Sequence, residues 1–190
     1  MVETIHLSHI PEGLALYVSC YTNVTNAAYL KEQLIAANQD FNYAFIDASV
    51  ILSRKHLLAA CFRALNDYIH DRLKSNNVQS EIVFCLSPNN NIGEAFRRFG
   101  IGDGSRHLVA VKVGEAGDVT PEVVERHLQS VVQGQKVEFN DDWLAGVCDV
   151  SRVRKVYKVP DENKAEDLDH EAKNRLEAQV LGLMCLRGAT

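Results

Sequence analysis

The stretch EIVFCLSPNNNIGEAFRRFG, residues 81–100, contains the clearest change of structural element in the chain. It begins with a continuous apolar run, Glu81–Leu86, which is typical of a central strand covered on both faces. Asn91 follows as a capping residue, and Glu94 stands three positions later, where its side chain can complete a capping box. Gly100 then indicates a left-handed helix end. The stretch therefore predicts a strand, a polar turn and a helix.

Strand and helix patterns alternate on both sides of this stretch. Apolar runs at Leu14–Cys20 and His107–Val113 predict strands, and residues 44–51 fit either a strand or an extended link. Capping residues and apolar spacing predict helices at Thr25–Ala37, Ser53–Leu73, residues 120–133, residues 140–144 and residues 151–157. The alternation predicts an α/β fold with a single mixed sheet packed with helices.

The last part of the chain differs in composition. Residues 160–169, PDENKAEDLD, are strongly charged and predict a solvated linker. We therefore divide the chain into a single α/β domain over residues 1–160 and a charged linker with a C-terminal partner-binding helix over residues 161–190. The helix is amphipathic, with an apolar stripe and further apolar residues near its end: Leu168, Ala172, Leu176, Val180, Leu181, Leu183, Met184 and Leu186. Such a surface docks on a partner or completes the core of its own domain.

Composition is that of an ordinary globular protein. The chain has 190 residues, of which 46% are hydrophobic and 24% charged, and its net charge is -5. An acidic surface does not attract nucleic acid as a whole, so any RNA contact has to be a local basic patch. The five scattered cysteines predict reduced core thiols in an intracellular protein. Because no apolar run reaches the ~18–20 residues that cross a bilayer, we expect no membrane contact.

Residue patterns for catalysis or metal binding are weak. The glycine run at residues 100–104 follows a helix instead of preceding one, which predicts a turn and not a phosphate loop. Cysteines and histidines do not cluster at zinc spacings. We expect Cys85 to be an inert thiol, and Asp141 and Asp142 to mark a helix start. The sequence thus predicts no enzyme, cofactor or metal. A small enzyme that uses Cys85 or the two aspartates is the alternative.

The asparagine run Asn89–Asn91 has a second interpretation beyond capping. Three consecutive asparagines lower strand and helix propensity without an evident packing return. A helix start with free N–H groups beside several amides suits a phosphate or a base edge. Arg97 and Arg98 follow about two turns along the same helix. The residues alone leave structure and ligand contact equally open.

The same stretch resembles the signature of the TPRKB family, the small subunits of the KEOPS/EKC complex that bind its atypical kinase. The matching residues are 81–84, 86–92, 94–95 and 99–101, supported by 134–135, 138–142, 154–158 and 186–188. The blocks are most similar to fungal members, and the resemblance extends from about Leu16 to Gly188.

This resemblance implies a non-catalytic accessory subunit that supports threonylcarbamoyladenosine modification of tRNA. It implies direct binding to the atypical kinase and to the acceptor end of tRNA. The catalytic ATPase-like subunit and the dimerisation subunit would be indirect partners in the same complex. Fungal members are also linked to telomere maintenance and transcription, so we expect the protein in both cytoplasm and nucleus. On its own we expect it to be a monomer.

We assign the two implied contacts to two sets of residues. The tRNA-binding set is Asn89, Asn90, Asn91, Arg97, Arg98, Lys55 and His56. The kinase-binding set is Leu176, Val180, Leu183, Met184, Leu186 and Arg187. The rival from another class is the stand-alone small enzyme that uses Cys85 or Asp141 and Asp142. A third possibility is an autonomous small RNA-binding protein, which the negative net charge and the 7% aromatic content disfavour.

Overall fold

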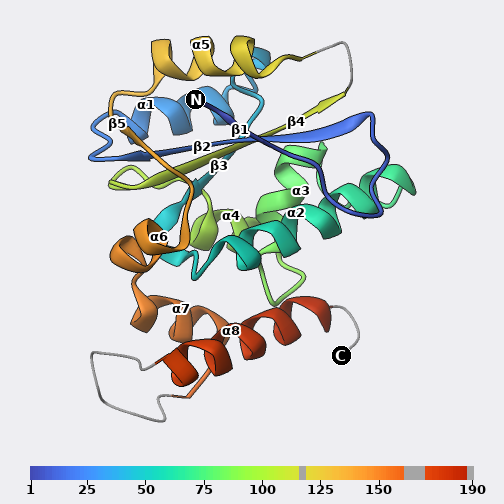
Figure 1. Ribbon diagram of the computed structural model, residues 1–190, viewed down its shortest axis with the longest axis vertical. Coiled ribbons are helices and arrows are strands. Elements are labelled where there is room, and N and C mark those ends of the chain that lie inside the picture. The colour runs from blue at the N-terminus through green and yellow to red at the C-terminus, as the bar shows by residue number, and fades with distance from the viewer. Residues whose placement is uncertain (116–118, 161–169, 188–190) are drawn as a thin grey trace.

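A five-stranded sheet forms the centre of the protein (Figure 1). The computed structural model describes residues 1–115, 119–160 and 170–187. The strands are β1 (Glu3–Ile5), β2 (Leu14–Thr22), β3 (Ala44–Asp47), β4 (Leu108–Glu115) and β5 (Gln135–Val137). Their order is β1-β2-β4-β3, and β5 pairs with β2 beyond the end of β1.

The central position of β2 in the sheet explains why its sequence is continuously apolar. Residues 14–21 are all buried, because side chains on the two faces of the strand enter two different cores. Leu16 and Val18 point into the larger core, whereas Tyr17 and Tyr21 point into the smaller one. A strand that is covered on both faces has no polar positions in its period of two.

Helices cover both faces of the sheet (Figure 1). On one face lie α1 (Ala27–Ile35) and α5 (Pro121–Val131), which contribute to the smaller core. The other face carries the remaining helices: α2 (Arg54–Ile69), α3 (Val78–Cys85), α4 (Ile92–Phe99), α6 (Asp141–Val147), α7 (Val150–Tyr157) and α8 (His170–Cys185). Two 3-10 turns, η1 (Gln39–Phe41) and η2 (Ala48–Val50), flank β3.

The expected α/β fold with one helix-packed sheet is confirmed, and its strand pairings are antiparallel throughout. β2 and β3 run in the same direction, as the helical connection between them suggests. They do not pair with each other, however, because β4 lies between them and runs antiparallel to both. The position of β4 therefore prevents a parallel β2–β3 pair, and β1 and β5 also pair antiparallel with β2, so the sheet is antiparallel where a mixed one was expected.

The strand predicted at residues 81–86 is wrong, because residues 81–85 belong to helix α3 and Leu86 is its C-cap. Asn77 caps the helix by accepting a hydrogen bond from the Ser80 N–H at 2.8 Å. Seven of the eight helix residues are buried, since α3 lies between the sheet and α2. A helix surrounded on all sides has no polar face, and a short apolar run then cannot be told from a buried strand.

Local capping signals mostly place the helices correctly. Ser53, Asn91, Thr120 and Asn140 each accept the expected backbone hydrogen bond at a helix start. Several boundaries differ from the prediction. Asn26 and not Thr25 precedes α1, α2 ends at Ile69, and Asp149 caps α7 in place of Ser151. The ends of α1, α5 and α6 also shift by two or three residues, to Ile35, Val131 and Val147. Thr25 faces elsewhere, since its hydroxyl donates to the Gln133 carbonyl at 3.3 Å.

Position 100 requires glycine for a different reason from the one predicted. Its φ of -67° is not left-handed, so the predicted left-handed helix end is wrong. A Cβ at this position would lie 2.6 Å from the carbonyl oxygen of Phe96. Gly100 also forms an isolated bridge with Ile46 of β3. Glycine is therefore required because a side chain here would collide with the backbone of the last turn of α4.

The C-terminal helix α8 packs against α2, and its buried side chains belong to the larger core (Figure 1). Residues 161–169, which include most of the predicted linker and Leu168, lie outside the described residues. Within the described part of the chain, no helix combines the length and apolar character needed to span a membrane.

Candidate functional site

The asparagine turn between α3 and α4 is held largely by its own side chains. Asn89 accepts hydrogen bonds from the Ser87 hydroxyl (3.2 Å) and the Asn91 N–H (3.0 Å), and it donates to Glu94 at 2.9 Å. Asn91 caps α4 by accepting from the Glu94 N–H at 2.9 Å. The predicted capping box does not form, because the Glu94 carboxylate binds Asn89 instead. Asn90 is exposed and, among described residues, makes no side-chain hydrogen bond.

The two arginines of α4 have different roles. Arg97 is exposed and lies 3.3 Å from a Glu94 oxygen. Arg98 is half-buried, forms an ion pair with Glu94 and donates to the Val156 carbonyl at 3.0 Å. The hydrogen bond from Arg98 is the main reason why the pKa of Glu94 is lowered. Arg97 can therefore reach a ligand, whereas Arg98 joins α4 to α7.

Lys55 and His56, at the start of α2, do not extend this surface. The exposed Lys55 ammonium lies 2.8 Å from Glu177 of α8. His56 is fully buried, so its assignment to a tRNA contact is wrong. Its Nδ1 accepts from the Leu52 N–H at 3.2 Å, and its Nε2 lies 2.9 Å from the Tyr157 hydroxyl. His56 lies on the buried face of α2, whereas Lys55 lies on the exposed face. The spacing of residues in the sequence did not show which of the two would be buried.

A cavity of about 530 Å³, which the sequence patterns did not predict, lies beside α4. The α1–η1 segment forms one wall, and the start of α3 and the C-terminal end of α4 form the other. Its lining combines aromatic rings, amides and two basic residues: Phe41, Tyr43, Phe45, Phe96; Asn38, Gln39, Asn42, Asn76, Asn77, Gln79; Lys31 and Arg97. Of the residues predicted to bind tRNA, only Arg97 lines it. The amide and aromatic run at residues 38–43, NQDFNY, was the available sequence signal.

The chemistry of the cavity suits a flat polar ring. Aromatic faces stack on bases, and amides hydrogen-bond to base edges. Gln79 is buried, its Nε2 lies 3.5 Å from the Val113 carbonyl, and its Oε1 has no partner among the described residues. A buried amide oxygen without a partner is an acceptor that a ligand N–H can satisfy.

The C-terminal helix is mainly a part of its own domain. Leu176, Val180 and Met184 are buried in the larger core, so the expectation that they form a free docking stripe is wrong. Arg187 is also buried, with its guanidinium 3.9 Å from the ring centroid of Phe84 and donating to the Phe84 carbonyl. These side chains are buried because the apolar stripe of α8 packs against α2.

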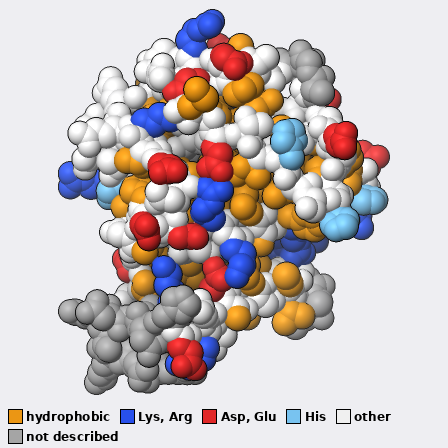
Figure 2. Space-filling model, viewed as in Figure 1, with side chains coloured by type: hydrophobic (Ala, Val, Ile, Leu, Met, Phe, Trp, Pro, Cys, Tyr) orange, Lys and Arg blue, Asp and Glu red, His pale blue; other side chains and the backbone are white. Residues whose placement is uncertain are grey.

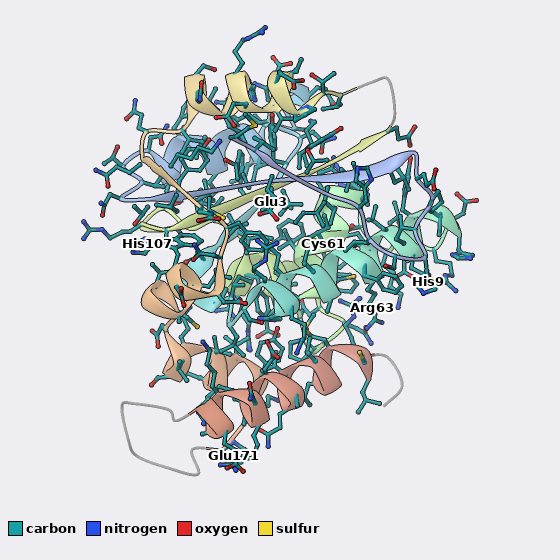
Figure 3. The ribbon with its side chains drawn as sticks, viewed as in Figure 1. Glu3, His9, Cys61, Arg63, His107 and Glu171 are labelled. Atoms are coloured by element: carbon teal, nitrogen blue, oxygen red, sulfur yellow. The ribbon has the colours of Figure 1, made fainter. Side chains whose placement is uncertain are left out.

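Two members of the predicted kinase-binding set remain at the surface. Leu183 is 36% exposed and Leu186 is 58% exposed, and Figure 2 shows hydrophobic side chains at this end of α8. On α2, Phe62 is 38% exposed. It precedes Arg63, which donates to the carbonyl oxygens of Met184 and Arg187 and lies between α2 and α8 in Figure 3. We call Phe62, Leu183 and Leu186 the α2–α8 apolar surface.

The residues of the alternative enzyme hypothesis have structural surroundings. Cys85 is buried, and burial raises the pKa of its thiol to about 11. Asp141 accepts a hydrogen bond from the Arg54 N–H at 2.7 Å, at the start of α2. Asp142 is exposed in the first turn of α6, where an acidic residue stabilises a helix start.

An antiparallel sheet covered by helices, with an amide- and aromatic-lined cavity and an exposed apolar helix end, defines an α/β binding protein. The model of one family, described as kinase binding protein CGI-121, matches residues 21–188. The chain belongs to this family, which confirms the resemblance found in the sequence.

Curated relatives match the chain along nearly its whole length. A protein of Aspergillus terreus named EKC/KEOPS complex subunit cgi121 is 50% identical over 194 residues, covering 100% of this chain and 98% of the relative. The protein of the same name from Aspergillus fumigatus is 47% identical over 189 residues, with 100% and 98% covered. The one from Schizosaccharomyces pombe is 35% identical over 173 residues, with 91% and 93% covered.

Proposed function

We propose that this chain is a non-catalytic accessory subunit of the EKC/KEOPS complex. In this role it binds the kinase subunit and the single-stranded acceptor end of tRNA, and it supports threonylcarbamoyladenosine modification. Family membership carries the proposal, since relatives named as subunits of this complex align along their full lengths. The proposal extends to a cytoplasmic and nuclear location and to the fungal roles in telomere maintenance and transcription.

The kinase-binding part of the proposal uses the α2–α8 apolar surface. Large apolar side chains that stay exposed beside a packed core are typical anchors of a protein interface. Leu183 lies in the last turn of α8 and Leu186 directly follows the helix, and hydrogen bonds from Arg63 and Arg187 fix this end of α8. A surface that is already rigid loses little entropy on binding, which favours affinity.

Two paired substitutions test this contact with the purified kinase subunit. Leu183→Glu combined with Leu186→Glu places two charges at the apolar surface and should weaken binding by ~30-fold or more, the effect of losing an interface hot spot. The matched control is Val123→Glu, because Val123 is 55% exposed on α5, across the sheet from α8. Calorimetric titration measures both. Unchanged affinity of the folded double variant would exclude α8 as the contact.

The tRNA-binding part of the proposal uses the cavity beside α4 and the exposed residues next to it. Splayed bases of a single strand can stack on the aromatic lining, while Arg97 at the same cavity attracts phosphate. Exposed Asn90 and the free N–H groups at the start of α4 lie at the other end of this helix, where they could bind a neighbouring part of the strand. The net charge of -5 limits the phosphate contribution, so we expect base contacts to supply much of the affinity.

Binding of intact tRNA and of tRNA trimmed of its terminal nucleotides distinguishes the acceptor end from the rest of the molecule. Wild type should prefer intact tRNA. Arg97→Glu should weaken that binding and reduce the salt slope by about one. Arg175→Glu is the matched control, because Arg175 is an exposed arginine of α8 that pairs with Glu171. A Ser80→Trp variant, which fills the cavity, should also lose the preference for intact tRNA. Equal wild-type affinity for both tRNAs would exclude the acceptor end.

A further inference from the structure

Three metal-ligating side chains meet at the interface of α2 and α3. Among the described residues, Asp67, Glu81 and Cys85 form the one such group, and their ligand atoms lie within 4.8 Å of one another. Asp67 comes from α2, whereas Glu81 and Cys85 come from α3. The spacing of four residues on a helix places Glu81 and Cys85 on the same face, one turn apart. Glu81 and Cys85 are buried, and Asp67 is half-buried.

Glu81 supplies an independent indication of a ligand. Its Oε2 accepts hydrogen bonds from the N–H groups of Lys74 (3.0 Å) and Ser75 (2.8 Å) and from the Ser75 hydroxyl (2.6 Å). Its Oε1 is fully buried and has no partner among the described residues. An unpaired carboxylate oxygen in the interior is costly, so the three donors orient a carboxylate whose second oxygen still needs a cation or a donor.

Arg187 supplies the electrostatic complement of such a site. Its Nη2 lies 3.5 Å from the Cys85 sulfur, and its Nε has no partner among the described residues. Two carboxylates and one thiolate around a divalent cation leave one negative charge. Two guanidiniums stand beside it: Arg187, and Arg72, whose Nη2 lies 3.3 Å from Oδ1 of Asp67. A donor that faces a metal-bound thiolate from outside the ligand set is a common feature of such sites.

We propose that Asp67, Glu81 and Cys85 bind one Zn²⁺ ion. A set of two oxygens and one sulfur suits Zn²⁺, whereas Mg²⁺ and Ca²⁺ prefer oxygen ligands alone. On binding, the metal ion replaces the Cys85 thiol proton, which passes to solvent, and no electrons are transferred. The side chain of Asp67 is 21% exposed, so the site borders on solvent. A water molecule could therefore act as the fourth ligand of the metal ion.

The site would link metal binding to the end of α8. Arg187 contacts the Cys85 sulfur and the Phe84 carbonyl, and Arg63 holds the carbonyl of Arg187. A thiolate attracts the guanidinium more strongly than a thiol does. Bound Zn²⁺ should therefore slow amide hydrogen exchange in the last turn of α8 and raise the melting temperature of the protein.

Co²⁺ is a suitable probe, because its bond to a thiolate gives a near-ultraviolet charge-transfer band that carboxylates and imidazoles do not give. Titration of the full chain with Co²⁺ should produce this band at one equivalent, and Zn²⁺ should remove it by competition. Cys85→Ala should abolish the band, and Asp67→Asn should weaken metal binding by ~10-fold or more. Cys185→Ser is the matched control, since Cys185 is the exposed thiol.

The variants also separate the possible failures. Absence of the band in wild type at one equivalent of Co²⁺ would overturn the proposal, and Glu81 would then serve only the turn at Lys74 and Ser75. A band that is lost in Cys185→Ser but kept in Cys85→Ala would overturn it as well. Asp67→Asn keeps the test decisive if Cys85→Ala does not fold, because Asp67 is only half-buried. These measurements use neither kinase nor tRNA, so their outcome is independent of the proposed function.

Discussion

His56 should make the stability of the fold depend on pH in the mildly acidic range. Its ring is neutral in the core: the Leu52 N–H occupies Nδ1, and Nε2 donates to the Tyr157 hydroxyl, which itself donates to the Leu86 carbonyl. Burial lowers the pKa of His56 from 6.5 to about 4. A proton on Nδ1 would also face the Leu52 N–H, so the charged ring has no acceptor there.

The sign and size of the effect follow from linkage. Between pH 6.5 and pH 4 the unfolded chain binds a proton at His56 and the folded chain does not, so stability falls as the pH falls. The contribution is complete above pH 6.5. With folded and unfolded pKa values of about 4 and 6.5, the loss relative to pH 8 is about 2 kcal/mol at pH 5 and about 3 kcal/mol at pH 4.

Urea denaturation at a series of pH values measures this loss, with His56→Gln as the reference protein. A glutamine amide can donate toward Tyr157 but does not titrate. Carboxylates with lowered pKa values, such as Glu94 beside Arg98, also lose stability as the pH falls, but they are shared by both proteins and cancel in the difference. Wild type should therefore lose about 2 kcal/mol more than the variant between pH 8 and pH 5. Parallel pH profiles would refute the buried neutral imidazole.

Three further changes test the packing of the fold. Gly100→Ala should destabilise by ~1–3 kcal/mol in urea denaturation, because the added Cβ would lie 2.6 Å from the Phe96 carbonyl oxygen. Gly182→Ala, on α8 with no atom within 4 Å of its Cβ, should instead stabilise by ~0.5–1 kcal/mol. Ser53→Ala removes the cap of α2 and a hydrogen bond to α8, so the urea midpoint should indicate a loss of ~1–2 kcal/mol. Mass spectrometry after thiol alkylation of the native protein should find Cys185 modified first, and slow reaction at the buried thiols Cys20, Cys61 and Cys85.

The sequence alone determined the elements whose signals are local. Strands β2 and β4 were predicted because residues covered on both faces form continuous apolar runs. Ser53, Asn91, Thr120 and Asn140 identified helix starts because a cap bonds to a backbone N–H only two or three residues away. The family signature was likewise readable, since it consists of contiguous residues.

Only the tertiary structure decided what depends on distant neighbours. Residues 81–86 could be strand or helix, and their burial between α2 and the sheet, with a cap from Asn77, makes them a helix. The face that α2 turns toward the core contains His56, whereas Lys55, one residue earlier, is exposed to solvent.

The same limit applies to the candidate sites. The cavity beside α4 brings the α1–η1 segment together with the start of α3 and the end of α4, which are far from it in the chain. Arginine is usually a surface residue, but Arg187 is buried on Phe84, because α8 packs on α2 after 100 intervening residues. Sequence periodicity describes one element at a time, whereas burial is set by which elements pack together.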